Sequence, residues 1–131
     1  MISPLKKSRA KTVRPRVKIW LEADGESVLC RGLSDILRAV DETGSVKSGA
    51  AKVGRSYRFV WARIKEAEAA FGTSLVESRV GGREAKRSEL TPLARDLLST
   101  FDEMCAKVYQ LVDGVFAEQV KETLRRHKHQ P

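Results

Sequence analysis

The chain has 131 residues, of which 41% are hydrophobic and 32% charged, and it carries a formal net charge of +8 with a sequence pI near 9.8. This length suits one globular domain, no apolar run approaches the roughly 20 residues that a membrane-spanning helix needs, and the N-terminus lacks the apolar segment of a signal peptide, so we expect a cytoplasmic protein. The positive charge predicts a polyanionic partner, which composition alone leaves open between DNA, RNA and an anionic membrane.

Residues 1–16 form a basic arm that we expect to be disordered. They hold six Lys or Arg, two prolines and no acid, so they cannot bury enough surface to offset the entropy lost on ordering. Such an arm can add phosphate or minor-groove contacts to a DNA complex. A solvated tail is the alternative.

The segment after the arm predicts a β-hairpin. Asp24-Gly25 lies between the β-prone runs 17–21 and 27–30, and a type I′ turn needs positive φ at both central residues. Alternation places three apolar side chains on one face of the first run: Val17, Ile19 and Leu21. We expect this hairpin to cover the core.

Three short helices are predicted next. The first ends at Gly44, which can take the left-handed C′ conformation, and carries an apolar stripe of Leu33, Ile36, Leu37 and Val40. Ser45 then caps a second helix, Val46 to Val53. Gly54 ends that helix, and one residue later Ser56 is the predicted cap of the third. Two helices joined by a tight glycine-containing turn predict a helix-turn-helix.

The third helix has two faces with different predicted roles. At about 100° per residue, one face gathers the side chains that we expect in the core, namely Tyr57, Val60, Trp61, Ile64 and Phe71. The opposite face carries Arg55, Arg58, Phe59 and Ala62, with Arg63 at its margin. A cationic face at a capped helix N-terminus suits an anion. We therefore predict the recognition helix of a DNA-binding domain.

Particular contacts are predicted for this helix. We expect Arg55 and Ser56 to lie near phosphates at the start of the helix, and Arg58, Phe59 and Arg63 to face the major groove. An arginine can pair bidentately with guanine, and Phe59 can touch a thymine methyl group. For Phe59, burial under the segment that follows is the alternative.

A β-hairpin, or wing, is predicted directly after this helix. Residues 75–80 are expected to form a strand, 81–88 a loop and 89–91 a short return strand. The loop carries Arg83, Lys86 and Arg87 against one acid, Glu84, which suits contact with the sugar-phosphate backbone. A charged loop that is merely solvated is the alternative, and the neighbouring helix-turn-helix favours the DNA contact.

A long helix over residues 92–126 follows the wing. Thr91-Pro92 provides a cap with proline at the first helical position, and Asp113-Gly114 can kink or break the helix. Heptad spacing predicts a dimer interface formed by Leu97, Phe101, Met104, Val108, Leu111 and Val115. A second apolar row can pack on the winged domain: Leu93, Leu98, Cys105, Val112 and Phe116. The alternative is a helix packed wholly in its own monomer.

Enzyme chemistry and metal binding find little support in the sequence. There is no pair of carboxylates at useful spacing, no nucleophile beside a base and no glycine-rich phosphate loop before a helix. Cys30 and Cys105 lack the spacing of metal ligands or of a disulfide framework, and we interpret both as small buried apolar residues. His127 and His129 form an incomplete ligand set, so we interpret residues 127–131 as a solvated tail.

Six short motifs carry a family resemblance that covers residues 17–115: Gly44-Ser45-Val46, Ala50-Ala51-Lys52, Gly54-x-Ser56-Tyr57-x-x-x-Trp61-x-x-Ile64, Leu75-Val76-Glu77, Gly81-Gly82 and Leu90-Thr91. They resemble the N-terminal domain of molybdate-dependent transcription regulators of the ModE type. That domain is a winged helix-turn-helix related to the DNA-binding domain of LysR-type regulators. The resemblance implies a dimer joined through the long helix, which binds a palindromic operator, commonly as a repressor.

Two departures from the family pattern limit what the resemblance implies. Full-length members carry C-terminal molybdate-binding domains, and this chain ends where those would begin, so a molybdate ligand is possible but not supported by this domain alone. The family usually has arginine directly after Leu-Val-Glu, whereas here Ser78 holds that place and Arg79 follows. A shift of one residue in a strand moves the side chain to the other face.

The sequence therefore predicts a mainly α fold with small β elements: a basic arm (1–16), a winged helix-turn-helix with an N-terminal hairpin (17–91), a long dimerisation helix (92–126) and a tail (127–131). The predicted function is a sequence-specific regulator, a repressor that binds double-stranded DNA as a homodimer, with no membrane partner, no enzyme activity and no cofactor, linked to molybdate metabolism. The predicted DNA contacts are Ser45, Lys47, Arg55, Ser56, Arg58, Phe59, Arg63, Arg79, Arg83, Lys86 and Arg87. A winged-helix protein-interaction module and a molybdate or tungstate sensor are the alternatives.

Overall fold

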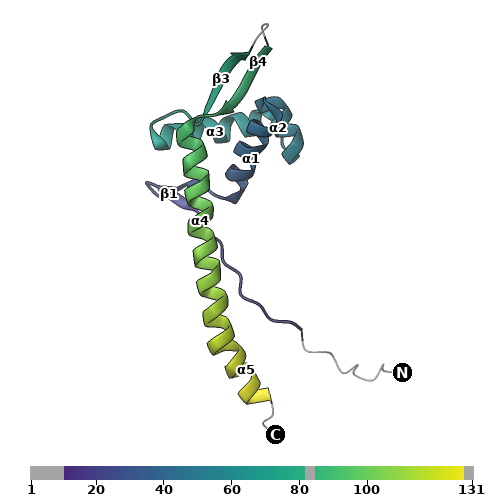
Figure 1. The fold of residues 1–131 in the computed structure, drawn as a ribbon, viewed down its shortest axis with the longest axis vertical. Coiled ribbons are helices and arrows are strands. Elements are labelled where there is room, and N and C mark those ends of the chain that lie inside the picture. The colour runs from purple at the N-terminus through teal and green to yellow at the C-terminus, as the bar shows by residue number, and fades with distance from the viewer. Residues whose placement is uncertain (1–10, 82–84, 129–131) are drawn as a thin grey trace, which may run out of the picture. The chain divides into compact units, whose positions relative to one another are not determined.

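The computed structural model describes residues 11–81 and 85–128 (Figure 1). These residues divide into two compact units, one within residues 18–106 and one that joins residues 11–17 with residues 107–128. The predicted mainly α architecture with two small hairpins is confirmed. Its elements are β1 (Leu21–Ala23), β2 (Glu26–Leu29), α1 (Arg31–Thr43), α2 (Val46–Val53), α3 (Tyr57–Phe71), β3 (Val76–Gly81), β4 (Ala85–Leu90), α4 (Pro92–Val115), the π-helical turn η1 (Phe116–Val120) and α5 (Lys121–Lys128).

The N-terminal hairpin forms at the predicted turn but is shorter than predicted. Asp24 and Gly25 have φ values of 51° and 82°, the positive values that a type I′ turn requires. Residues 17–20 are not part of a strand. Because β2 ends at Leu29 and α1 begins at Arg31, the residues before β1 have no strand opposite them with which to pair.

Helix α1 ends, and helices α2 and α3 begin and end, where the sequence predicts. The N-caps Ser45 and Ser56 accept backbone N–H bonds from Ser48 and Phe59 at 2.9 and 3.1 Å. Gly49 lets α2 approach α1 closely, since a Cβ atom there would lie only 2.8 Å from Val40 Cγ2 and 2.9 Å from the Val40 backbone nitrogen. The three helices, the base of the wing and the start of α4 share one core, whose most deeply buried large side chains are Leu29, Leu33, Leu37, Val40, Val60 and Leu75.

The wing is a regular antiparallel hairpin, and its return strand is longer than predicted. The pairing runs from Val76 opposite Leu90 to Gly81 opposite Ala85, so residues 85–88, expected in the loop, belong to β4. The sequence prediction failed because this charged segment has little intrinsic strand preference and is held by its partner strand. Arg83 lies outside the described residues.

Helix α4 starts at the predicted cap and continues through Gly114. The Thr91 hydroxyl accepts the Ala94 N–H at 3.2 Å. The helical run departs from α geometry only after Val115, in the π-turn η1, and then continues as α5. The helix therefore does not break at Gly114.

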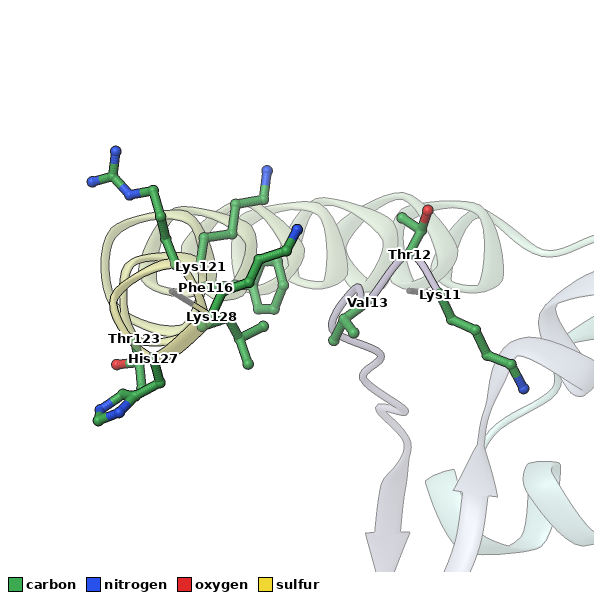
Figure 2. A pocket seen from close by; sticks show the side chains of 10 residues that line it. Lys11, Thr12, Val13, Phe116, Lys121, Thr123, His127 and Lys128 are labelled. Carbon is green, nitrogen blue, oxygen red and sulfur yellow. The ribbon is translucent and has the colours of Figure 1, made fainter. Parts of the chain in front are cut away.

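The unit that contains α5 has an apolar pocket of its own. Val13, Phe116 and Leu124 line it, with basic side chains around them, and Lys121 Nζ lies 5.9 Å from the Phe116 ring centroid (Figure 2). His127 also lines this pocket, whereas His129 is not among the described residues. Within residues 11–81 and 85–128, no three His, Cys, Asp or Glu side chains come together as metal ligands, and no helix is long and apolar enough to cross a membrane.

Candidate nucleic-acid interface

The candidate site is built on the N-terminal half of α3. Gly54, at the end of α2, has a φ of 72°, a conformation that glycine adopts without strain. This turn lets α3 begin only four residues after α2 ends. Arg58 is exposed, and at about 100° per residue it lies on the side of α3 away from the buried Val60. Its guanidinium is therefore presented outward on a fixed helix, as predicted.

Tyr57 and Trp61 lie on the surface, so the prediction that they pack in the core is wrong. Their exposed fractions are 52% and 46%. The buried stripe of α3 consists of Val60, Ile64 and Ala67. Trp61 follows Val60 directly and is therefore turned about 100° away from it around the helix axis. Because the buried stripe is narrow, both rings remain on the flank of α3.

A shallow pocket lies beside these rings, between α3, the N-terminus of α2 and the base of the wing. Hydroxyl and ammonium groups surround it, and its polar and aromatic lining residues are Ser45, Lys47, Tyr57, Trp61, Lys65, Glu68, Ser78 and Ser88. Lys65 Nζ lies 5.5 Å from the Trp61 ring centroid, within the range of a cation–π interaction. This arrangement suits an anionic ligand that also presents apolar surface.

The carboxylate of Glu68 joins α3 to the wing. It accepts backbone N–H bonds from Leu75 and Val76 at 2.8 and 3.2 Å, and it pairs with Lys65 at 3.2 Å. Burial raises the pKa of Glu68, but the two backbone donors and Lys65 lower it, and the net pKa lies below the ordinary value. An ionised Glu68 therefore holds the start of β3 against α3.

The opposite flank of α3 faces α1, and its cationic groups are paired within the chain. The Arg55 guanidinium lies over the Phe59 ring, 4.6 Å from its centroid. The Arg63 side chain is only 24% exposed and reaches Glu66 at 3.3 Å, and its Nη2 lies 4.0 Å from Cys30 Sγ. Phe59 and Arg63 thus do not share a face with Arg58, and their predicted contacts with the major groove stay predictions. Cys30 is half-buried, in contrast to the prediction.

The two faces of the wing carry different side chains, and the charged groups of one face are paired within the chain. Strand alternation places Ser78, Lys86 and Ser88 on the face that borders the pocket and places Arg79 and Arg87 on the other. Lys86 is exposed. Arg79 Nε pairs with Glu89 at 2.9 Å. Because this arginine stands one residue later than the arginine of the family pattern, it lies on the face of the wing away from the pocket.

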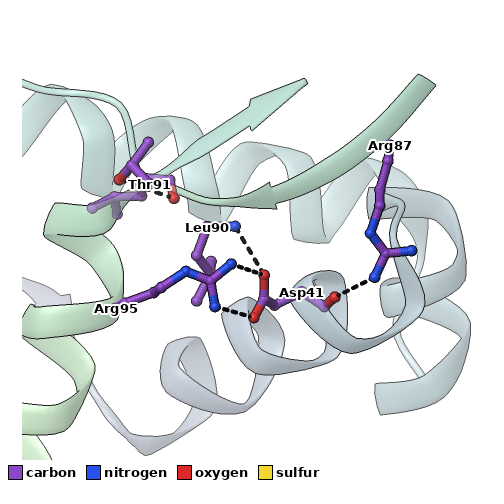
Figure 3. A network of polar contacts seen from close by, with 6 residues as sticks. Asp41, Arg87, Leu90, Thr91 and Arg95 are labelled. Atoms are coloured by element: carbon purple, nitrogen blue, oxygen red, sulfur yellow. Dashed lines mark hydrogen bonds and ion pairs between the residues drawn. The ribbon is translucent and has the colours of Figure 1, made fainter. Parts of the chain in front are cut away.

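Arg87 is part of a polar network that fixes the wing on α1 (Figure 3). It donates to the backbone oxygen of Asp41 at 3.2 Å, while the Asp41 carboxylate accepts the Leu90 N–H at 3.1 Å and binds Arg95 of α4 at 2.8 and 3.0 Å. Gly44 makes room for this network, since a Cβ atom there would lie 2.6 Å from Arg87 Nη1. Arg87, predicted to contact DNA, is bound within the chain.

The predicted dimer residues of α4 divide into two groups. Phe101 is buried in the core of the same chain, and Leu97 is partly buried against that core. Cys105 is also buried, as predicted. Val108 is half-buried, while the other three side chains remain exposed, namely Met104, Leu111 and Val115.

The sequence of this segment matches a known family. Residues 34–95 match the model described as bacterial regulatory helix-turn-helix protein, lysR family. By this match residues 34–95 resemble a LysR-type helix-turn-helix domain, and they are called the LysR-type domain below. The Molybdenum transport protein ModE of Herbaspirillum seropedicae is 32% identical over 69 residues, which cover 53% of this chain and 26% of that protein. The predicted resemblance to ModE-type N-terminal domains is thereby confirmed, and the chain matches about a quarter of that relative's length.

Solved structures similar to the LysR-type domain include three crystal structures. The CbnR_DBD–DNA complex is 21% identical, with a TM-score of 0.49 over 66% of this chain and 94% of that chain. The BenM_DBD/catB site 1 DNA complex is 21% identical, with a TM-score of 0.47 over 76% and 97%. ArgP from Mycobacterium tuberculosis is 27% identical, with a TM-score of 0.42 over 66% and 29%.

Sequence reasoning missed the residues of the LysR-type domain that border the pocket on the α3 side, chiefly Tyr57, Trp61 and Lys65. A signal for them was present in the sequence. A stripe drawn through the small and aliphatic residues alone, Val60, Ile64 and Ala67, already satisfies helical periodicity and leaves both rings on a flank.

Proposed function

We propose that the chain is a sequence-specific transcription regulator that binds double-stranded DNA as a homodimer at a palindromic operator and acts as a repressor. The observation that carries this proposal is the exposed Arg58 on the outward face of α3 in a LysR-type domain. A helix held by a cap and a buried stripe can enter a major groove as a rigid body, and an exposed guanidinium on it can bind guanine bidentately.

Two exposed lysines on the pocket side of α3 supply the electrostatic part of the proposed interface. Lys47 lies in the first turn of α2 and lines the pocket, and Lys86 lies on the same face of the wing as Ser78 and Ser88. Phosphate contacts fix the register of a protein on the duplex without reading its sequence. The hydroxyls of Ser45 and Ser56, at helix N-termini, lie where a phosphate oxygen is favoured. The remaining predicted contacts stay predictions, namely Arg55, Phe59, Arg63, Arg79, Arg83 and Arg87.

The proposed dimer uses the exposed apolar row of α4. Met104, Leu111 and Val115 follow heptad spacing with the half-buried Val108, the pattern by which two helices pair. A two-fold dimer presents two copies of α3 to two half-sites. Leu111→Glu places a charge in this row and is expected to convert a dimer into monomers in sedimentation velocity. An unchanged sedimentation coefficient would remove this row from the interface.

The proposed link to molybdate metabolism rests on the relative named Molybdenum transport protein ModE. We propose that the genes under control serve molybdenum uptake or use, without a molybdate site in the described residues. Mapping the bound sites genome-wide tests this proposal. Sites away from such genes would contradict it while leaving DNA binding intact.

The central test is a fluorescence-anisotropy titration with duplexes selected from genomic DNA at several salt concentrations. Arg58→Ala is expected to relax specificity at one position of each half-site, whereas Lys86→Ala should weaken all sequences alike and reduce the salt slope by about one unit. Lys18→Ala, which removes an exposed charge before β1, is the matched control. If neither Arg58→Ala nor Lys86→Ala changed DNA affinity, the basic surface would be incidental, as in a protein-interaction module.

A further inference from the structure

Tyr57 and Trp61 form an exposed aromatic patch that the domain does not need for its core. The two residues lie at positions i and i+4, so their side chains are neighbours on the helix surface, and about half of each side chain is open to solvent. The buried stripe of α3 is complete without them. Large adjoining apolar surfaces on a small domain mark an interaction surface. These two side chains are called the aromatic patch below.

The surroundings of the aromatic patch select an anionic partner. Ammonium groups of Lys47 and Lys65 and hydroxyls from α2 and the wing line the adjoining pocket. The carboxylate that lines it, on Glu68, is already bound to two backbone N–H groups and to Lys65. Apolar rings between cations and hydroxyls complement a DNA groove, in which base edges lie between two rows of phosphates. An apolar surface of another protein would offer no acceptor to the exposed Lys47.

We infer that the aromatic patch selects thymine in each half-site by packing against its C5 methyl group. This inference rests on the proposed DNA-binding function and adds a base preference to it. The thymine methyl is the apolar feature that base edges present in the major groove, and two aromatic rings provide apolar surface with few hydrogen-bonding groups. Arg58, between the two rings in sequence, supplies the hydrogen bonds that a guanine requires. The half-site is then read by hydrogen bonds at one position and by methyl contact at another.

The experiment removes single methyl groups from the DNA. Each thymine of a duplex bound by the wild-type protein is replaced in turn by deoxyuridine, which lacks only the C5 methyl group. At one or two positions in each half-site we expect about a fourfold loss of affinity, the loss that corresponds to one buried methyl group. When a C·G pair replaces T·A at the same positions, the protein should bind the duplex with 5-methylcytosine about fourfold more tightly than the duplex with unmethylated cytosine.

Protein variants assign the effect to the aromatic patch. In Trp61→Ala or Tyr57→Ser, the difference between thymine and deoxyuridine should disappear at one of those positions, whereas Tyr57→Phe, which keeps the ring, should retain it. Trp20→Ala is the matched control, because this tryptophan is 48% exposed and lies before β1, where its indole donates to Glu22 at 3.1 Å. The substituted side chains are exposed, so circular dichroism should show unchanged helix content.

The possible outcomes separate the inference from the function on which it rests. Absence of salt-sensitive duplex binding would overturn the proposed function. Tight binding that no deoxyuridine substitution weakens would overturn the thymine inference alone. A deoxyuridine effect that persists in both Trp61→Ala and Tyr57→Ser would assign methyl recognition to other residues and would equally overturn it.

Discussion

The two flanks of α3 carry similar side chains but differ in what those side chains contact. On the flank toward α1, Arg55 covers the Phe59 ring and Arg63 is paired with Glu66. On the flank toward the wing, the Trp61 ring is half exposed and faces a pocket lined by lysines and hydroxyls. Because Lys65 on this flank is likewise paired, with Glu68, the two flanks are distinguished by the groups of neighbouring elements that border them, and counts of cations and rings along a helix do not identify a binding surface.

Gly49→Ala is expected to have the largest effect, because it disturbs the packing on which both flanks depend. A Cβ atom would lie 2.8–3.0 Å from Val40 atoms, including backbone, so α1 and α2 must separate at a cost of about 3 kcal/mol. Urea unfolding measures this loss. Gly114→Ala, where a Cβ atom meets nothing within 4 Å, should instead stabilise α4 by up to about 1 kcal/mol. Equal stability of the two variants would contradict the close packing of α2 on α1.

Asp41→Ala should disturb the flank of α3 that faces the wing and leave the flank toward α1 unchanged. It removes the bidentate partner of Arg95 and the acceptor of the Leu90 N–H, which we expect to destabilise the fold by about 2 kcal/mol. The wing should also lose its fixed position, which exchange of the Ser88 amide proton, bound to the Gly44 oxygen, would report. Glu42→Ala removes an exposed carboxylate paired with Lys52 and should change stability by less than about 0.5 kcal/mol.

A pair of arginine variants compares the outward face of α3 with the flank toward α1. Arg58→Ala should reduce affinity for a selected site by roughly tenfold, because the loss of a bidentate base contact costs about 1.4 kcal/mol. Arg63→Ala should reduce it by less than about threefold, because the guanidinium of Arg63 is engaged inside the chain. Anisotropy titrations of both variants against the same duplex measure the two losses of affinity. A larger loss for Arg63→Ala would reverse the assignment of the two sides.

The smallest effect is expected from the acid dependence of Glu68, which anchors the wing-side flank. Its pKa is lowered in the folded state, so its contribution to stability is present above the unfolded pKa of about 4.3 and is lost as the pH falls through the folded pKa. Glu68→Gln should therefore flatten the loss of stability below that pH in denaturant titrations. Glu66→Gln, at an exposed position of the same helix, is the matched control for the loss of one carboxylate, and the same flattening in both variants would contradict the role of Glu68.

The elements that depend on near neighbours in the chain could be predicted from the sequence. The Asp24-Gly25 turn, the caps Ser45 and Ser56 and the end of α1 at Gly44 were all predicted correctly. Each depends on a backbone conformation or on a hydrogen bond spanning at most four residues. Local sequence therefore determines where the helices of this domain begin and end.

What could not be predicted depends on partners distant in the sequence. Asp41 and Arg95 are 54 residues apart, and nothing near Arg87 indicates that it binds the end of α1. The burial of Tyr57 and Trp61 was predicted wrongly because periodicity gives the direction of a core face but not its width. That width is set by how closely the neighbouring elements pack around the helix.

The exposure of Trp61 also gives the protein an optical probe at its proposed interface. The chain has two tryptophans, Trp20 and Trp61, so Trp20→Phe leaves one indole whose fluorescence arises from α3 alone. Stacking or desolvation of that ring by a ligand would change its emission intensity and wavelength. Stopped-flow fluorescence of this variant could then time the arrival of α3 in a groove without any label on the protein or the DNA.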